Sequence, residues 1–233
     1  MARKKGDKPD LLTKEEMDKL LMSVSHDIYF VCLYNILLHT GRRIGEIYGT
    51  KRGNKTIGGV KVKDIDFDEN TMTTNILKTK KRKLTIICEH CKHKNTHKNI
   101  CCGQCGKPLP AINPENLKYD IAETKTISLK PQLAVLLKSY IKSADLTPTK
   151  ILFHERSLSY IKKSIKKHIK DAGIQKKYSI HGFRHYFVTQ CKRDNMTNDQ
   201  IALWTGHKNP NTLNLYNRMV PKDIEKRIME VEL

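Results

Sequence analysis

The stretch 181–216, HGFRHYFVTQCKRDNMTNDQIALWTGHKNPNTLNLY, constrains the fold of this chain more than any other. Apolar residues recur in it twice at helical spacing, which predicts two short amphipathic helices, the second capped by Asn198 or Asp199. The ends of these helices carry four polar residues: His181, Arg184, His207 and Tyr216. Side chains at neighbouring helix ends can converge on one point, so the sequence predicts a polar site there.

Three motifs stand in order along the chain: HTGRRIGEI at 39–47, HGFRH at 181–185, and GH at 206–207 with Tyr216 nine positions further on. They resemble the T-G-L-R-I-x-E-[LI], H-x-L-R-H and G-H…Y motifs of tyrosine recombinases, the phage integrase type. Each motif alone is weakly specific, but the order and the spacing together are specific. The resemblance runs from about Leu11 to the C-terminus, apart from one insertion.

The resemblance implies a site-specific recombinase or integrase that joins DNA to a tyrosine through a 3′-phosphate, with no metal required for the chemistry. Tyr216 would be the nucleophile, and its phenol, with an ordinary pKa near 10, needs help to lose its proton. Arg43 and Arg184 would hold the non-bridging phosphate oxygens, because a guanidinium matches their geometry. His207 would bond the same oxygens, and His181 would act as acid and base.

Two further residues would support this chemistry. Glu46, three positions after Arg43, would hold that guanidinium, although a plain surface i,i+3 pair is the simpler interpretation. In the family, a hairpin lysine protonates the leaving 5′ oxygen, and Lys78 is the residue predicted here. The alternatives are Lys80, Lys81 and Lys125, because the insertion obscures the alignment.

Two other functions remain open for a chain with these motifs. A type IB topoisomerase would use similar chemistry to relax supercoils without pairing two sites. A catalytically silent regulatory module would bind DNA and form no covalent link. The complete set of arginines, histidines and tyrosine argues against the silent module.

Net charge points to the same partner. The 233 residues include 44 Lys and Arg against 24 Asp and Glu, a formal charge of +20 that favours a polyanion such as double-stranded DNA. Arg42 and the polar faces of a predicted helix at 157–172 would contact the DNA backbone, although a solvated face is the usual interpretation of such a run. The helix contributes Lys162, Lys163, Lys166, Lys167 and Lys170.

The composition also suggests where the protein works. No stretch reaches the roughly 18 apolar residues of a membrane span, and the basic N-terminus lacks the apolar segment of a signal peptide. We therefore expect a cytoplasmic, DNA-associated protein with no membrane partner.

A cysteine motif marks the insertion. Two Cys-x2-Cys pairs separated by ten residues have zinc-ribbon spacing, which predicts a closed, structural Zn²⁺ site formed by Cys88, Cys91, Cys102 and Cys105. Disulfides are the alternative, disfavoured by an intracellular setting. Cys101 is left over, and His90, His93 or His97 are substitute ligands. The insertion, residues 84–110, would either touch the DNA backbone or only close a long hairpin.

The predicted architecture is α+β: a mainly helical tyrosine recombinase catalytic domain over 11–233, with a small antiparallel sheet and the inserted zinc ribbon, after a basic mobile arm over 1–10. Helices are expected at 28–38, 131–141 and 221–231, strands at 60–68, 71–78 and 120–129, and a loop at 49–59. Thr13 and Glu16 predict a capping box at the first helix. In the family, a preceding clamp domain is usual, and the terminal helix often docks into a neighbouring protomer, which implies a tetramer on paired sites. Packing of that helix on its own domain is the alternative.

Overall fold

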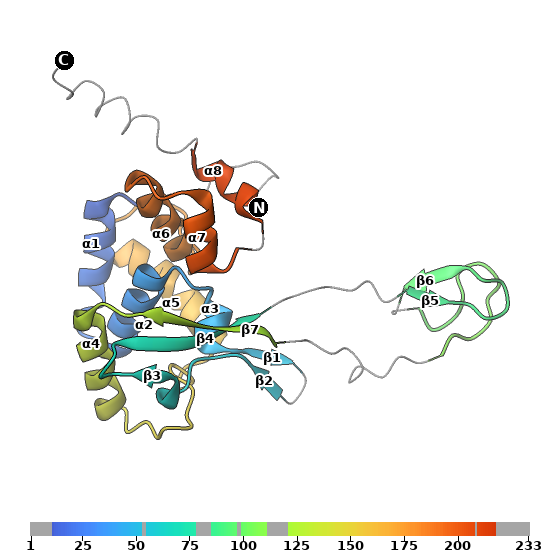
Figure 1. The fold of residues 1–233 in the computed structure, drawn as a ribbon, viewed down its shortest axis with the longest axis horizontal. Helices are drawn as coiled ribbons and strands as arrows, with labels where there is room; N and C mark the ends of the chain where they lie inside the picture. The colour runs from blue at the N-terminus through green and yellow to red at the C-terminus, as the bar shows by residue number, and fades with distance from the viewer. Residues whose placement is uncertain are drawn as a thin grey trace, which may run out of the picture. The chain divides into compact units, whose positions relative to one another are not determined.

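The chain divides into two compact units in the computed structural model (Figure 1). The larger unit comprises Met1–Ile76 and Glu123–Leu233, and the smaller unit comprises Leu77–Ala122. The residues described are 11–52, 55–77, 85–96, 99–110, 121–207 and 209–217. The predicted arm at 1–10, the terminal helix at 221–231 and the candidate Lys78 lie outside them.

The larger unit is mainly helical. Its helices are α1 (Lys14–Ser23), α2 (Ile28–Thr40), α3 (Ile44–Tyr48), α4 (Pro131–Ser143), α5 (Leu158–Asp171), α6 (Gly182–Arg193), α7 (Asn198–Thr205) and α8 (Asn214–Asn217), with 3-10 turns η1 (Val62–Asp64) and η3 (Pro210–Leu213). The helices predicted at 28–38, 131–141 and 157–172 are confirmed to within two residues at each end. Among the described residues, none of these helices is long and apolar enough to cross a membrane.

Helix starts follow the capping chemistry of the sequence. The Oγ1 atom of Thr13 accepts a hydrogen bond from the Glu16 amide (3.2 Å), and the Glu16 carboxylate accepts one from the Thr13 amide (2.7 Å), which confirms the predicted capping box. The predicted cap of α7 is wrong. Thr197 and Gln200 form the same reciprocal pair there, and this pair satisfies two free amides and starts the helix at Asn198.

Helix α2 forms the centre of the core. It packs against α4 and α6, and Leu33, Ile36 and Leu37 are at most 1% exposed. A helix apolar on nearly all sides is stable only when neighbours cover it all round. The end of α2, which carries the first motif, is therefore held firmly relative to α6, which carries the second.

A three-stranded sheet, in the order β3-β4-β7, completes the larger unit (Figure 1). Its strands are β3 (Ile65–Asp66), β4 (Thr71–Leu77) and β7 (Ile121–Ser128). Strands β3 and β4 are antiparallel, with Ile65 opposite Met72, and the Thr73 and Thr126 hydroxyls lie 3.0 Å apart on β4 and β7. The strands predicted at 71–78 and 120–129 correspond to β4 and β7.

Two predictions about this region are wrong. Of the strand predicted at 60–68, Ile65–Asp66 form β3, whereas Val62–Asp64 form the turn η1, because the Asp64 carboxylate accepts a hydrogen bond from the Lys61 amide (2.9 Å) and closes the turn. The loop predicted at 49–59 holds an antiparallel hairpin, β1 (Thr50–Arg52) and β2 (Lys55–Ile57). β-branched residues at Thr50, Thr56 and Ile57 favour this extended pairing.

The smaller unit contains an antiparallel pair, β5 (Thr85–Ile87) and β6 (Lys94–Thr96). Among the described residues of this unit, the apolar core has four buried members: Ile86, Cys88, Cys102 and Leu109. So small a core gives little stability by itself, which makes a metal or covalent cross-link the expected source of the rest. The insertion predicted at 84–110 lies within this unit.

Candidate active site

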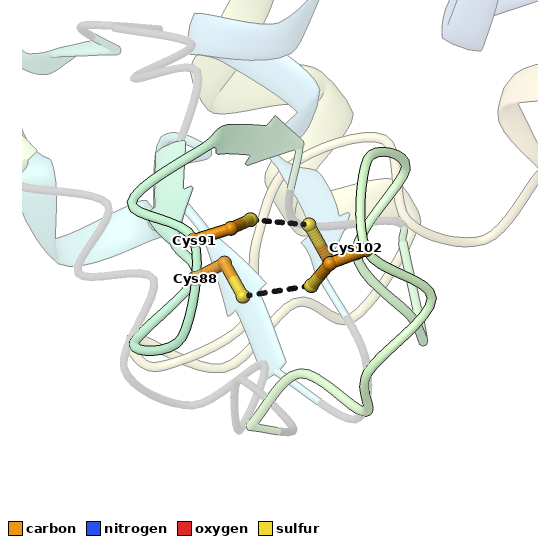
Figure 2. Close-up of side chains that lie close together, drawn as sticks. Cys88, Cys91 and Cys102 are labelled. Atoms are coloured by element: carbon orange, nitrogen blue, oxygen red, sulfur yellow. Dashed lines mark hydrogen bonds between the residues drawn. The ribbon is translucent and has the colours of Figure 1, made fainter.

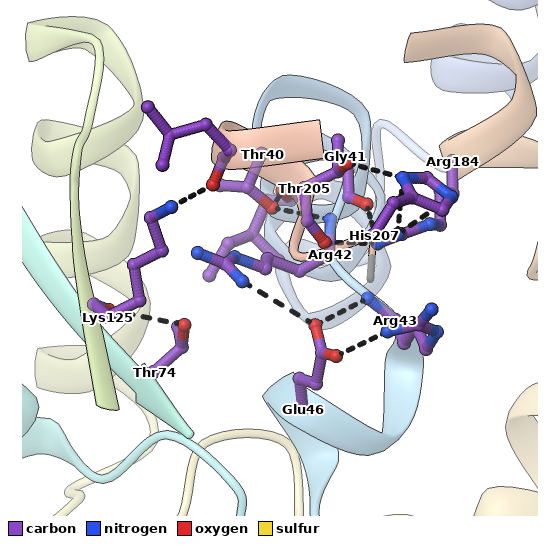
Figure 3. Close-up of polar contacts among 12 residues, drawn as sticks. Thr40, Gly41, Arg42, Arg43, Glu46, Thr74, Lys125, Arg184, Thr205 and His207 are labelled. Carbon is purple, nitrogen blue, oxygen red and sulfur yellow. Dashed lines mark hydrogen bonds and ion pairs between the residues drawn. The ribbon is translucent and has the colours of Figure 1, made fainter. Parts of the chain in front are cut away.

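Arg184 joins the ends of two helices. Its side chain is buried, and Nη1 donates hydrogen bonds to the carbonyls of Gly41 (2.8 Å) and Thr205 (2.9 Å) (Figure 3). Gly41 caps the C-terminus of α2 and Thr205 is the last residue of α7, so both carbonyls lie at negative helix ends that favour a cation. Burial, followed by the charge of Arg43, lowers the pKa of Arg184 to about 10, which leaves it charged at neutral pH.

Two glycines let the helices end where Arg184 can reach them. Gly41 and Gly206 have φ angles of +61° and +73°, in the left-handed region that glycine adopts without strain. A Cβ atom on Gly41 would lie 2.4 Å from Cδ1 of Phe187. The first motif therefore needs glycine at 41 both for its backbone conformation and for its contact with α6.

His207 follows Gly206 and faces Arg184. Nη2 of Arg184 lies 3.1 Å from each ring nitrogen of His207, and the Thr205 hydroxyl lies 2.6 Å from Nδ1 (Figure 3). Burial, followed by the charge of Arg184, lowers the pKa of His207 to about 3. The ring is therefore neutral at physiological pH, with one nitrogen as donor and the other as acceptor.

His181 stands at the N-terminal end of α6, one turn before His185. Its ring reaches the surface, yet the protein around it and the charges of Arg184 and Arg43 lower its pKa to about 4. The rings of His181 and His185 meet edge to face, with centroids 4.7 Å apart. Two imidazoles thus lie side by side at this end of the helix.

The Tyr216 hydroxyl is hydrogen-bonded to Nδ1 of His185. The tyrosine is 5% exposed and belongs to a small apolar cluster formed by α6, α7, η3 and α8, with Val188, Ile201 and Leu213 among its members. Burial raises the pKa of Tyr216, and the charge of Arg184 partly offsets the rise. The phenol is therefore protonated at neutral pH and has an imidazole directly on its hydroxyl.

His185 is the contact that sequence reasoning missed. The residue lies inside the HGFRH motif, at a position where an ordinary helix-end histidine is the simpler interpretation. The available signal was its spacing: residues four apart on a helix share a face, so His185 and His181 project to the same side.

Arg43 presents a partly exposed guanidinium, with its side chain 41% exposed. The Glu46 side chain is fully buried; Oε1 accepts from Nη1 of Arg43 (3.0 Å) and Oε2 from the Arg43 amide (3.2 Å) (Figure 3). The predicted contact between the two residues is therefore present, and it is a buried support rather than a surface pair. It leaves one side of the Arg43 guanidinium facing solvent.

The neighbouring Arg42 lies inside the protein. Its side chain is 0% exposed, and its Nη1 atom lies 3.9 Å from Oε2 of Glu46. The sequence predicted a DNA backbone contact for Arg42. The structure contradicts that prediction, because the Arg42 guanidinium lies inside the protein against the buried carboxylate of Glu46.

Among the candidate lysines, Lys125 alone falls within the described residues, since 78–84 do not. It lies on β7, and its Nζ donates a hydrogen bond to the Leu203 carbonyl near the end of α7 (Figure 3). The Thr74 hydroxyl donates to the Lys125 carbonyl (3.3 Å), which ties this part of β7 to β4. Lys125 therefore reaches the same helix end that Arg184 binds.

Helix α5 has one basic and one apolar face. Ile161, Ser164, Ile165 and Ile169 are buried. The five lysines predicted to contact DNA are all exposed: Lys162, Lys163, Lys166, Lys167 and Lys170. The exposed face of α5 is thus densely positive, and the buried face holds the helix against the rest of the protein.

The smaller unit gathers four cysteine sulfurs. The Sγ atoms of Cys88 and Cys105 lie 3.6 Å apart, those of Cys91 and Cys102 lie 3.5 Å apart, and all four lie within 4.8 Å of one another (Figure 2). Four thiolates around one Zn²⁺, each about 2.3 Å from the metal, would stand about 3.8 Å apart. The four cysteines are therefore positioned to bind a metal.

Neighbouring groups also suit a cation there. A backbone hydrogen bond from Cys105 lowers the pKa of Cys102 to about 5. At Cys91, a backbone hydrogen bond from His93 lowers the pKa, but burial and the adjacent sulfurs together outweigh it and raise the pKa to about 12. Four clustered thiolates repel one another unless a cation lies between them.

Asn95 is a second contact that the sequence did not reveal. Its buried side chain donates from Nδ2 to the Cys102 sulfur (3.5 Å) and accepts at Oδ1 from the Gly103 amide (2.9 Å). Such contacts orient metal ligands. Cys101, in contrast, is exposed and lies outside the sulfur cluster.

Comparison with known proteins agrees with the fold and the motifs. The sequence model of the phage integrase family matches residues 112–222, which include the second and third motifs. No curated protein sequence matches the chain.

Three solved structures share the fold. The crystal structure of the XerA recombinase superposes with a TM-score of 0.65 at 20% identity, covering 97% of this chain and 66% of that one. The XerH site-specific recombinase, bound to its palindromic difH substrate after cleavage, gives 0.59 at 18%, covering 94% and 52%. The catalytic domain of bacteriophage HP1 integrase gives 0.55 at 14%, covering 95% of both chains.

Residues 112–222 therefore match the phage integrase family, and the chain has the fold of the tyrosine recombinase catalytic domain. It spans about two thirds of the length of XerA and about half that of XerH.

Proposed function

We propose that this chain is a site-specific recombinase that cleaves and rejoins double-stranded DNA through a covalent link at Tyr216. One observation carries the proposal. The hydroxyl of Tyr216 bonds to His185 on α6, and the same helix carries Arg184, whose guanidinium contacts His207. A nucleophile, a proton acceptor and two phosphate-binding groups thus belong to one local arrangement.

In the cleavage step, the Tyr216 oxygen attacks the phosphorus atom and the bond to the 5′ oxygen breaks. The phenol proton passes to His185, which in this proposal takes the acid and base role that the sequence assigned to the neighbouring His181. In the reverse step, a 5′ hydroxyl attacks the phosphotyrosine and the tyrosine recovers its proton. Atoms and charge balance with no redox partner.

The transition state places negative charge on the non-bridging oxygens. Arg43, with an open side to solvent, and Arg184, fixed by two carbonyls, would bind these oxygens, and His207, beside Arg184, would contact them as well. Because Arg184 is held by the ends of α2 and α7, little reorganisation is needed when the charge develops.

The leaving 5′ oxygen needs a proton, for which we propose Lys78. Lys125 is the principal rival, because its Nζ lies at the end of α7 in the described structure. Lys80 and Lys81 are the other two candidates.

XerH has been solved on its palindromic difH substrate. For this chain we propose binding to paired DNA sites as a tetramer joined through the C-terminal helix. A silent DNA-binding module is disfavoured by the completeness of the site. A topoisomerase-like relaxation is disfavoured by the family match.

We further propose that the four cysteines bind one Zn²⁺ as a structural ion. Four sulfur ligands complete a tetrahedral shell, which leaves no open position for substrate. The ion would supply the cross-link that the small core of this unit requires.

The lysines of α5 should contribute to DNA affinity through the phosphate backbone. Replacing Lys162 and Lys166 with alanine should lower the slope of log K against log salt by about 0.9 for each phosphate that the variant no longer neutralises, uniformly across sequences. Fluorescence anisotropy with one duplex at several salt concentrations measures this slope. Lys138→Ala, an exposed lysine on α4, is the control. Equal slopes in wild type and the double variant would exclude a DNA contact for α5.

Tyr216→Phe should abolish a DNA-linked protein band on nicked duplex while DNA binding persists. Tyr186→Phe, on the same helix as His185, should still form the band. A DNA-linked band formed by Tyr216→Phe would contradict the assignment of the nucleophile. If wild type forms no such band, the catalytically silent DNA-binding module is favoured instead.

The same trap identifies the general acid. Replacing the lysine that acts as general acid with alanine should lower the cleavage rate by about 10²–10⁴-fold. The rate of that variant should recover on DNA carrying a 5′-bridging sulfur, because a sulfur leaving group needs no proton. If the sulfur-substituted DNA restores cleavage by Lys125→Ala but not by Lys78→Ala, the general acid is Lys125 rather than Lys78.

Purified protein should contain one zinc ion per chain, and removing it with a chelator should unfold the smaller unit. Cys88→Ser and Cys102→Ser should lose the metal, whereas Cys101→Ser should retain it. Elemental analysis and the NMR signals of residues 85–110 report the two effects. Unchanged zinc content in Cys102→Ser, or disulfides in place of free thiols, would contradict the assignment.

A further inference from the structure

Arg42 is the largest of the fully buried side chains. A buried guanidinium is strongly unfavourable unless charges and hydrogen bonds compensate it, so its presence calls for a reason. The mechanism above does not use it, and the family motif has leucine at this position.

Glu46 lies between the two adjacent arginines (Figure 3). Oε1 accepts from the guanidinium of Arg43 at 3.0 Å, while Oε2 lies 3.9 Å from Nη1 of Arg42. The side chains of Arg42 and Glu46 are 0% exposed, against 41% for that of Arg43. One buried carboxylate therefore links an internal cation to the cation at the surface.

The charges of this group decide its effect on DNA. A pair formed by Glu46 and Arg43 alone is neutral overall, so the carboxylate would weaken the attraction of Arg43 for a phosphate. With Arg42 added, the three groups carry a net charge of +1, and the only exposed member is Arg43. Water screens charges weakly inside a protein, so the internal cation acts strongly on its neighbours.

We propose that Arg42 is a positioning residue that acts through Glu46. It neutralises the carboxylate and holds it in place, so that Arg43 is oriented by Glu46 without losing its charge toward the scissile phosphate. This inference rests on the proposed function.

The backbone supports the same role. The Arg42 amide donates to the Thr40 hydroxyl (3.3 Å), and the carbonyl of the intervening Gly41 accepts from Arg184 (2.8 Å). The short segment 40–43 thus connects both predicted phosphate-binding arginines. Arg42 fixes it from the interior side.

The test is a double-mutant cycle of R42M, E46Q and R42M/E46Q, with R42K as the charge-retaining variant. Methionine keeps a long unbranched side chain and removes the charge. Two quantities are measured for each protein: the affinity for nicked duplex and the single-turnover rate of the covalent adduct.

R42M should slow adduct formation by about 10-fold or more and change the DNA affinity by less than about threefold, whereas R42K should stay close to wild type. The fold-decrease in the adduct rate of the R42M/E46Q double variant should be smaller than the product of the two single fold-decreases, because both substitutions act on Arg43. A merely structural role would instead reduce affinity, rate and stability together and give multiplicative losses.

Three results overturn the inference. They are an R42M rate equal to wild type, multiplicative losses in the cycle, and an R42K rate as low as that of R42M. If R42M does not fold, R42Q replaces it in the cycle with the same criteria. Failure of the proposed function is distinguishable, since wild type itself then forms no adduct.

Discussion

The site depends on one buried charge, the guanidinium of Arg184. It is held by carbonyl oxygens at the C-terminal ends of α2 and α7, where unpaired carbonyls carry partial negative charge. The two helices belong to sequence motifs more than 150 residues apart, and the arginine fixes their ends against each other. The carbonyl contacts that compensate this burial also fix the position of the guanidinium to which we assign phosphate binding.

The candidate nucleophile is held in place mainly by apolar packing rather than by charge. Tyr216 is packed by apolar residues of its own chain, and its hydroxyl contacts His185. Burial keeps the phenol protonated, whereas the nearby Arg184 favours its anion. This balance suits a group that must lose its proton only when a phosphate and a proton acceptor are both in place.

Periodicity predicted α2 and α5 because both have clear apolar patterns, and Thr13 with Glu16 predicted the start of α1, whereas the start of α7 was misassigned by one or two residues. The strand predicted at 60–68 is reduced to β3, because one side chain, Asp64, closes a turn before it that alternation does not reveal. The motifs indicated Arg43, Arg184, His207 and Tyr216. They could not indicate that Arg42 turns inward or that His185 bonds the tyrosine, since both depend on side-chain direction at helix ends. Cysteine spacing predicted the sulfur cluster, whereas Asn95 became visible only in three dimensions.

The most direct measurement is mass spectrometry of the peptide that carries DNA after the covalent complex is trapped and digested with trypsin. The account predicts nucleotides attached through a 3′-phosphate to the peptide from Asn209 to Arg218, in which Tyr216 is the single tyrosine. Attachment at any other residue, or an unmodified 209–218 peptide from a protein that has cleaved DNA, would contradict it.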